Sequence, residues 1–144
     1  MATVIRTPVH LWIVGILAVL WNCIGAMDYV LTETRNASYL ADFSAAERTY
    51  FANFPAWAVT FWALGVWAGL LGSLLLLLRS RWAVPGFGLA LAGIAVFSVY
   101  QYLLSAAPDS LWRLPIIAIG VAIWVIAIML LVYAMRMRDR GILR

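Results

Sequence analysis

Four long apolar runs constrain this chain more than any other feature of its sequence. They lie at residues 9–31, 55–78, 84–104 and 114–135. A helix needs roughly 20 apolar residues to cross a hydrocarbon core of about 30 Å, so each run is long enough to span a membrane. Strands of a membrane β-barrel alternate apolar and polar residues, which these runs do not. We therefore predict an all-α polytopic membrane protein built as a four-helix transmembrane bundle.

The composition agrees with that prediction. Of 144 residues, 66% are hydrophobic and 11% are charged, a surface balance that a water-soluble domain cannot carry. Four spans with short connections use the whole length, so residues 1–144 are expected to form a single integral membrane domain. The connections at 79–83 and 105–113 are short and predict antiparallel neighbours, whereas residues 32–54 form a longer loop.

Arginines predict the direction of the chain through the membrane. In a four-span arrangement one side carries Arg6, Arg79, Arg81, Arg136, Arg138, Arg140 and Arg144, and the other carries Arg35, Arg48 and Arg113. The positive-inside rule then places both termini in the cytoplasm of a bacterial inner membrane and the 32–54 loop in the periplasm. Since the net charge of +4 comes from residues flanking the membrane, nucleic acid is not an expected partner.

The first apolar run also has features of a secretory signal peptide. A basic residue precedes it, and Ile24-Gly25-Ala26 would serve as a small-residue cleavage site. The run is longer than the apolar core of a typical signal peptide. We expect it to be retained as the first span.

The long loop contains one helix signal. Ser44 followed three residues later by Glu47 has the spacing of a capping box, so a short helix is predicted to begin at Ala45. Tyr50 and Phe54 would share its apolar face. Such a helix would either lie flat on the outer leaflet or cover the end of the bundle.

Polar side chains within the spans concentrate toward the predicted periplasmic side. Because they are costly in lipid, they should turn inward, either as the wall of a polar and aromatic pocket or as interhelical hydrogen bonds. Asp28 could pair with Arg35, Arg48 or Arg113; left unpaired, it would suit proton coupling. Six residues on this side, within the spans or next to their ends, are therefore candidates for binding a ligand: Asn22, Asp28, Tyr29, Arg35, Trp57 and Gln101.

Glycines in the second span predict close helix packing. Gly65, Gly69 and Gly72 present small residues at roughly helical spacing, which lets another helix approach closely. The approaching helix could belong to the same chain or to a second copy. We expect membrane lipids, a homo-oligomer or a partner membrane protein as the interacting species.

The sequence offers little for catalysis. Cys23 is the one cysteine and His10 the one histidine, so no disulfide, zinc site or bis-histidine haem is predicted. The chain also lacks lysine, a phosphate-binding glycine loop and a credible catalytic triad. We expect neither an enzyme nor a bound metal or cofactor.

Three segments carry a family resemblance: WNCIGAMDY at 21–29, TRN at 34–36, and the stretch from FPAW at 54–57 to Gly72. They resemble a family of small four-span inner-membrane proteins of proteobacteria, some of which carry an automated label of sugar transporter. The resemblance covers roughly the first two-thirds of the chain. It implies the four-span architecture and draws attention to Asn22, Asp28, Tyr29 and Arg35.

Two functions remain open from the sequence. The first is a non-catalytic membrane protein that binds a small or lipidic ligand, or a partner membrane protein, through a periplasm-facing polar and aromatic pocket. The alternative is a small oligomeric transporter of sugars or similar polar solutes that uses Asn22, Asp28 and Gln101. Transport requires a route to the cytoplasm, which the apolar inner halves of the spans do not supply within one chain.

Overall fold

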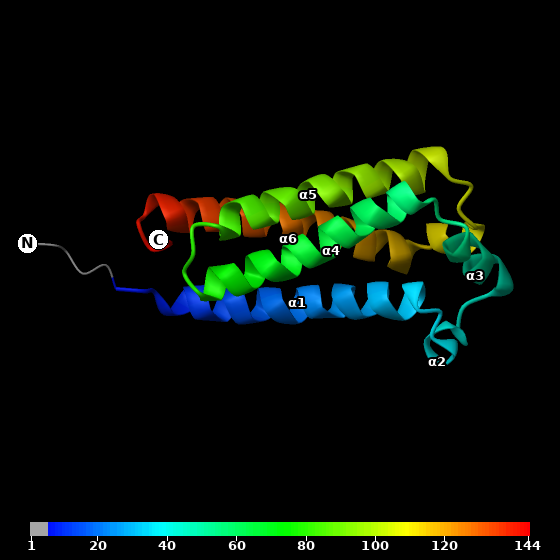
Figure 1. The fold of residues 1–144 in the computed structure, drawn as a ribbon, viewed down its shortest axis with the longest axis horizontal. Coiled ribbons are helices and arrows are strands. Elements are labelled where there is room, and N and C mark those ends of the chain that lie inside the picture. The colour runs from blue at the N-terminus through cyan, green and yellow to red at the C-terminus, as the bar shows by residue number, and fades with distance from the viewer. Residues whose placement is uncertain (1–5) are drawn as a thin grey trace, which may run out of the picture.

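Four long helices make up most of the fold (Figure 1). The computed structural model describes residues 6–144, which contain no β-strand. The long helices are α1 (Val9–Glu33), α4 (Ala56–Leu77), α5 (Ala83–Val99) and α6 (Leu114–Asp139). A π-helical turn, η1 (Tyr100–Leu104), continues α5, so that four helical segments are long and apolar enough to span a membrane. The prediction of an all-α, four-span membrane protein is confirmed.

Two of these helices run past the apolar runs of the sequence. α1 continues to Glu33 and α6 continues to Asp139. Their last turns carry charged side chains, which are solvated where a helix leaves the hydrocarbon region.

Three short helices connect the long ones at the same end of the molecule: α2 (Ala37–Leu40), α3 (Ala45–Ala52) and the 3₁₀ turn η2 (Asp109–Trp112). We call this end the loop end, and the opposite end, where α1 begins and α6 ends, the termini end. The Ser44 hydroxyl accepts a bond of 3.2 Å from the Glu47 amide, and the Glu47 carboxylate accepts one of 2.8 Å from the Ser44 amide. The capping box and the helix beginning at Ala45 are thus confirmed.

The helices pack in the order α1, α4, α5, α6, with the closest contact between α4 and α5. A Cβ atom built on Gly93 of α5 would lie 2.5 Å from the Gly65 amide nitrogen and 2.7 Å from the Phe61 carbonyl oxygen of α4. Gly72 likewise lies against Phe87 of α5. The glycines therefore bring two helix backbones of one chain together.

The termini end is filled by packed side chains. The buried apolar cluster consists of Leu11, Ala18, Leu76, Ala83, Phe87, Leu130, Ala134, Met137, Ile142 and Leu143. The last residues fold back onto the turn between α4 and α5, where the Arg144 amide donates to the Arg79 carbonyl at 2.8 Å. α1 meets α6 at this end, where His10 Nδ1 and the Tyr133 hydroxyl lie 2.6 Å apart.

Candidate functional site

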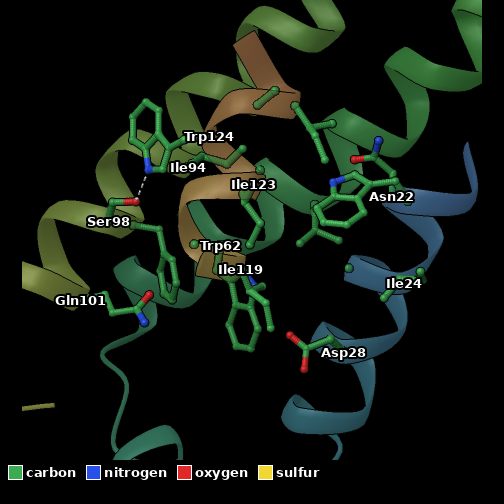
Figure 2. Close-up of a pocket in the computed structure, with 18 of the residues that line it drawn as sticks. Asn22, Ile24, Asp28, Trp62, Ile94, Ser98, Gln101, Ile119, Ile123 and Trp124 are labelled. Atoms are coloured by element: carbon green, nitrogen blue, oxygen red, sulfur yellow. Dashed lines mark hydrogen bonds between the residues drawn. The ribbon is translucent and has the colours of Figure 1, made fainter. Parts of the chain in front are cut away.

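A cavity of about 440 Å³ lies between the four long helices (Figure 2). Its volume is within the range of about 300–1,000 Å³ that is usual for small-molecule sites. Asn22 and Asp28 face it from α1, Trp62 from α4, Gln101 from η1 and Ile123 from α6. Each of the four spans thus contributes to its wall.

The one charged side chain that residues 6–144 contribute to the cavity wall lies at one end of the cavity, and the opposite end is apolar. At the loop end its wall includes Asp28, Tyr39, Gln101 and Tyr102. Toward the termini end its wall includes Phe87 and Leu130, which belong to the buried apolar cluster. A bound molecule would therefore meet polar groups near the membrane surface and apolar groups deeper in the membrane.

Asp28 accepts a hydrogen bond from the Tyr39 hydroxyl through Oδ1. Of the two alternatives left open by the sequence, an ion pair with Arg35, Arg48 or Arg113 is not formed, since the one ion pair within residues 6–144 joins Arg138 to Asp139. The chain turns sharply after α1, and Asn36 caps α2 by accepting a bond from the Tyr39 amide at 3.0 Å. This short connection places the Tyr39 phenol next to Asp28.

Asn22 lies on the cavity wall, but its amide is bound to neighbouring protein groups. Its Nδ2 donates to the Ala18 carbonyl at 2.9 Å and to the Ser73 hydroxyl at 3.1 Å, and the Ser73 hydroxyl donates to the Gly69 carbonyl at 2.8 Å. Its Oδ1 occupies the space where a Gly69 Cβ atom would lie. Asn22 therefore ties α1 to α4.

The side-chain amide of Gln101 differs from that of Asn22 in its hydrogen bonding. In residues 6–144 its side-chain amide makes no hydrogen bond to the protein, although it faces the cavity across from Asp28. It lies in η1, where the Ser105 amide donates to the Tyr100 carbonyl at 2.9 Å in the i to i+5 pattern of a π-turn. Single π-turns in membrane or soluble helices frequently occur at functional sites.

The other three sequence candidates lie outside this cavity. Tyr29 packs edge-on against Trp62, with ring centroids 5.0 Å apart, and Trp57 packs edge-on against Tyr100 at 5.3 Å. Arg35 lines a separate cavity of about 450 Å³ at the loop end. Asn22, Asp28 and Gln101 thus line one cavity, whereas Tyr29, Arg35 and Trp57 do not line it.

Sequence reasoning missed several wall residues. Trp124 of α6 donates from its indole nitrogen to the Ser98 hydroxyl at 3.2 Å, which links α6 to α5 inside the cavity (Figure 2). A tryptophan in the middle of a span needs an acceptor for its N–H, and that need could have indicated a partner on a neighbouring helix. Tyr39, in the loop, carried no such signal.

The cavity opens sideways between α1 and α6. Ile24 of α1 lines it and is 62% exposed, while Ile119 and Ile123 of α6 line it and are 57% and 37% exposed. α1 and α6 do not pack extensively on each other. In a membrane-spanning bundle, this opening faces the lipid.

α3 covers the loop end of the bundle. Glu47 accepts a bond of 2.7 Å from the Ser110 hydroxyl, and the Tyr50 and Ser105 hydroxyls lie 2.7 Å apart. The bond from Ser110 lowers the pKa of Glu47, and burial raises the pKa of Tyr50. Of the two arrangements expected for this helix, the contacts correspond to the one that covers the bundle.

Comparison with protein-family models, curated proteins and solved structures finds no match to this chain. In the part of the chain from residue 6 onward, no three His, Cys, Asp or Glu side chains lie together as a metal site would require.

Proposed function

We propose that this membrane protein binds an amphipathic ligand, such as a lipid, in the cavity between its four spans and does not catalyse a reaction. The observation that carries the proposal is the distribution of groups along the cavity: a charged and polar loop end, an apolar opposite end, and an opening between α1 and α6 to the surrounding lipid. An amphiphile already inserted in the bilayer has the same order of polar and apolar parts. It could enter without passing through water.

The surrounding bilayer limits which parts of the cavity can supply affinity for a ligand. Lipid tails are as apolar as the walls of the cavity, so transfer of a tail from the bilayer contributes little free energy. Shape and the polar end of the cavity must then supply the preference for one ligand over bulk lipid.

A cavity-filling variant tests the proposal. Gly25 lines the cavity, and a Cβ atom built there meets no atom within 4 Å, so Gly25→Phe would occupy the cavity without a backbone clash. Gly88 of α5 also has open space around it but lies outside the cavity wall, which makes Gly88→Phe a matched control. Native mass spectrometry of protein extracted from membranes should show a retained amphiphile on the wild type and Gly88→Phe. Gly25→Phe should have lost it.

Equal retention by both variants, or none by the wild type, would contradict ligand binding in this cavity. Copurification of a specific membrane protein with an empty cavity would point instead to a partner-binding role.

Transport is the competing function, and the family that the sequence resembles carries that label in part. Among residues 6–144, the packed cluster at the termini end, which includes Leu11, Leu76 and Phe87, supports binding because a polar solute would have to cross these apolar side chains. Uptake of a sugar or other polar solute into liposomes by the wild type, abolished in Asp28→Asn, would overturn the binding proposal.

We further propose that the protein lies in a bacterial inner membrane with its termini end in the cytoplasm, as a member of the family it resembles. Supporting this, the structure places Arg79, Arg81, Arg136, Arg138, Arg140 and Arg144 around the termini end. A fluorescent protein fused after Arg144 should fluoresce, since green fluorescent protein matures in the cytoplasm. A dark fusion, together with an active periplasmic alkaline phosphatase fusion at the same point, would reverse the orientation.

A further inference from the structure

The polar end of the cavity has a single charge. Among the residues 6–144 that line the cavity, Asp28 is the one acidic or basic side chain. Arg35 and Arg48 are the first two basic residues after Asp28 in the sequence, and they line the separate loop-end cavity instead. We propose that the ligand is an amphiphile with a positively charged amino group, held by Asp28; this inference rests on the proposed function.

Asp28 has room for a second hydrogen bond. Tyr39 donates to Oδ1, whereas Oδ2 has no hydrogen-bond donor within the described chain. The bond from Tyr39 holds the carboxylate in place, so Tyr39 is a positioning residue. A buried or lipid-facing carboxylate is costly unless a cation or several donors accompany it, and a ligand ammonium group supplies both.

Gln101 completes the arrangement from the opposite wall. Its amide is free of protein partners and faces the same space as Asp28 (Figure 2). An ammonium group has three donors, so it can bond to the Asp28 Oδ2 atom and still offer donors to other acceptors at the polar end, among which Gln101 lines the same cavity. An anionic headgroup would meet the Asp28 charge with no cation to offset it.

Three probes with one tail separate the headgroup from the rest of the ligand. Hexadecylamine, hexadecanol and hexadecyl phosphate should be titrated into purified full-length protein in one detergent, with binding measured by native mass spectrometry. We expect the amine to bind about tenfold more tightly than the alcohol, the effect of one charge-assisted hydrogen bond, and the phosphate to bind least.

Asp28→Asn is the informative variant because its amide oxygen can still accept from Tyr39 while the charge is gone. It should bind amine and alcohol equally. Tyr39→Phe, which keeps the charge, should retain the preference for amine. Comparison between variants in the same detergent removes any effect of the micelle on the probes.

A second pair of probes identifies the source of the amino group. Preference for phosphatidylethanolamine over phosphatidylglycerol would indicate a membrane phospholipid, whereas preference for hexadecylamine without it would indicate a single-chain amine. Both results support the inference.

Other results separate the two proposals. If the wild type binds the three hexadecyl probes equally, or prefers the phosphate, or if Asp28→Asn keeps the amine preference, the headgroup inference is wrong while ligand binding stands. If no probe binds to the wild type more than to Gly25→Phe, the proposed function itself fails.

Discussion

The contact between α4 and α5 should depend on the absence of a side chain at Gly93. In Gly93→Ala the new methyl group would lie 2.5 Å from the Gly65 nitrogen and 2.7 Å from the Phe61 oxygen, both backbone atoms that cannot rotate away. Restoring ordinary contact requires the two helices to separate by about 0.9 Å. A gap of that size forfeits roughly a quarter to a half of the dispersion energy of the atoms it parts.

We expect Gly93→Ala to lower the free energy of unfolding by about 1–3 kcal/mol relative to Gly88→Ala. The comparison is matched because both substitutions lie in α5 and gain the same helix propensity, up to about 1 kcal/mol in water. At Gly88 the methyl group meets nothing within 4 Å. The difference between the variants therefore isolates the clash.

The measurement is reversible unfolding in mixtures of dodecylmaltoside and SDS, followed by tryptophan fluorescence. Trp62 of α4 stacks on Phe97 of α5 with ring centroids 5.4 Å apart, so the summed emission of the eight tryptophans includes a contribution from this interface. If Gly93→Ala unfolds at the same SDS fraction as Gly88→Ala, the close backbone approach does not stabilise the bundle, and the reasoning is refuted.

Two further predictions concern the ends of the bundle. The pKa of Glu47 is lowered in the folded protein, so its bonds stabilise the covering helix above its ordinary value of 4.5 and are lost as pH falls through the lower folded value. Hydrogen exchange of residues 45–52, corrected for intrinsic rates, should therefore accelerate in acid for the wild type, and an identical pH profile for Glu47→Gln would contradict this. At the termini end, Leu76 is fully buried, and Leu76→Ala should cost about 2–5 kcal/mol in the same SDS assay, whereas the exposed Leu78→Ala should cost well under 1 kcal/mol.

The sequence predicted the parts of the fold that depend on local patterns. Apolar length determined the four spans, and the Ser44–Glu47 spacing determined where α3 begins. Both rest on interactions within a few residues, which the order of amino acids specifies directly.

Which residues line the cavity depends on how each helix is rotated about its own axis, and the sequence does not specify this rotation. α6 is apolar on all sides, so no periodicity distinguishes Ile123, which lines the cavity, from Val125, which does not. In lipid both faces can be apolar, and the usual contrast between core and surface is lost. The partner of Asp28 was missed for a related reason: charge suggested an arginine, but the turn at the end of α1 brings Tyr39 closer.

The sideways opening between α1 and α6 also determines which concentration of the ligand sets the occupancy of the cavity. A ligand that enters from the bilayer reaches the cavity by diffusion in two dimensions. The occupancy of the cavity then depends on the mole fraction of the ligand in the leaflet and not on its concentration in water. Because detergent dilutes that fraction, occupancy should fall with the amount of detergent added per protein, and it should recover when the protein is returned to a bilayer of the original composition.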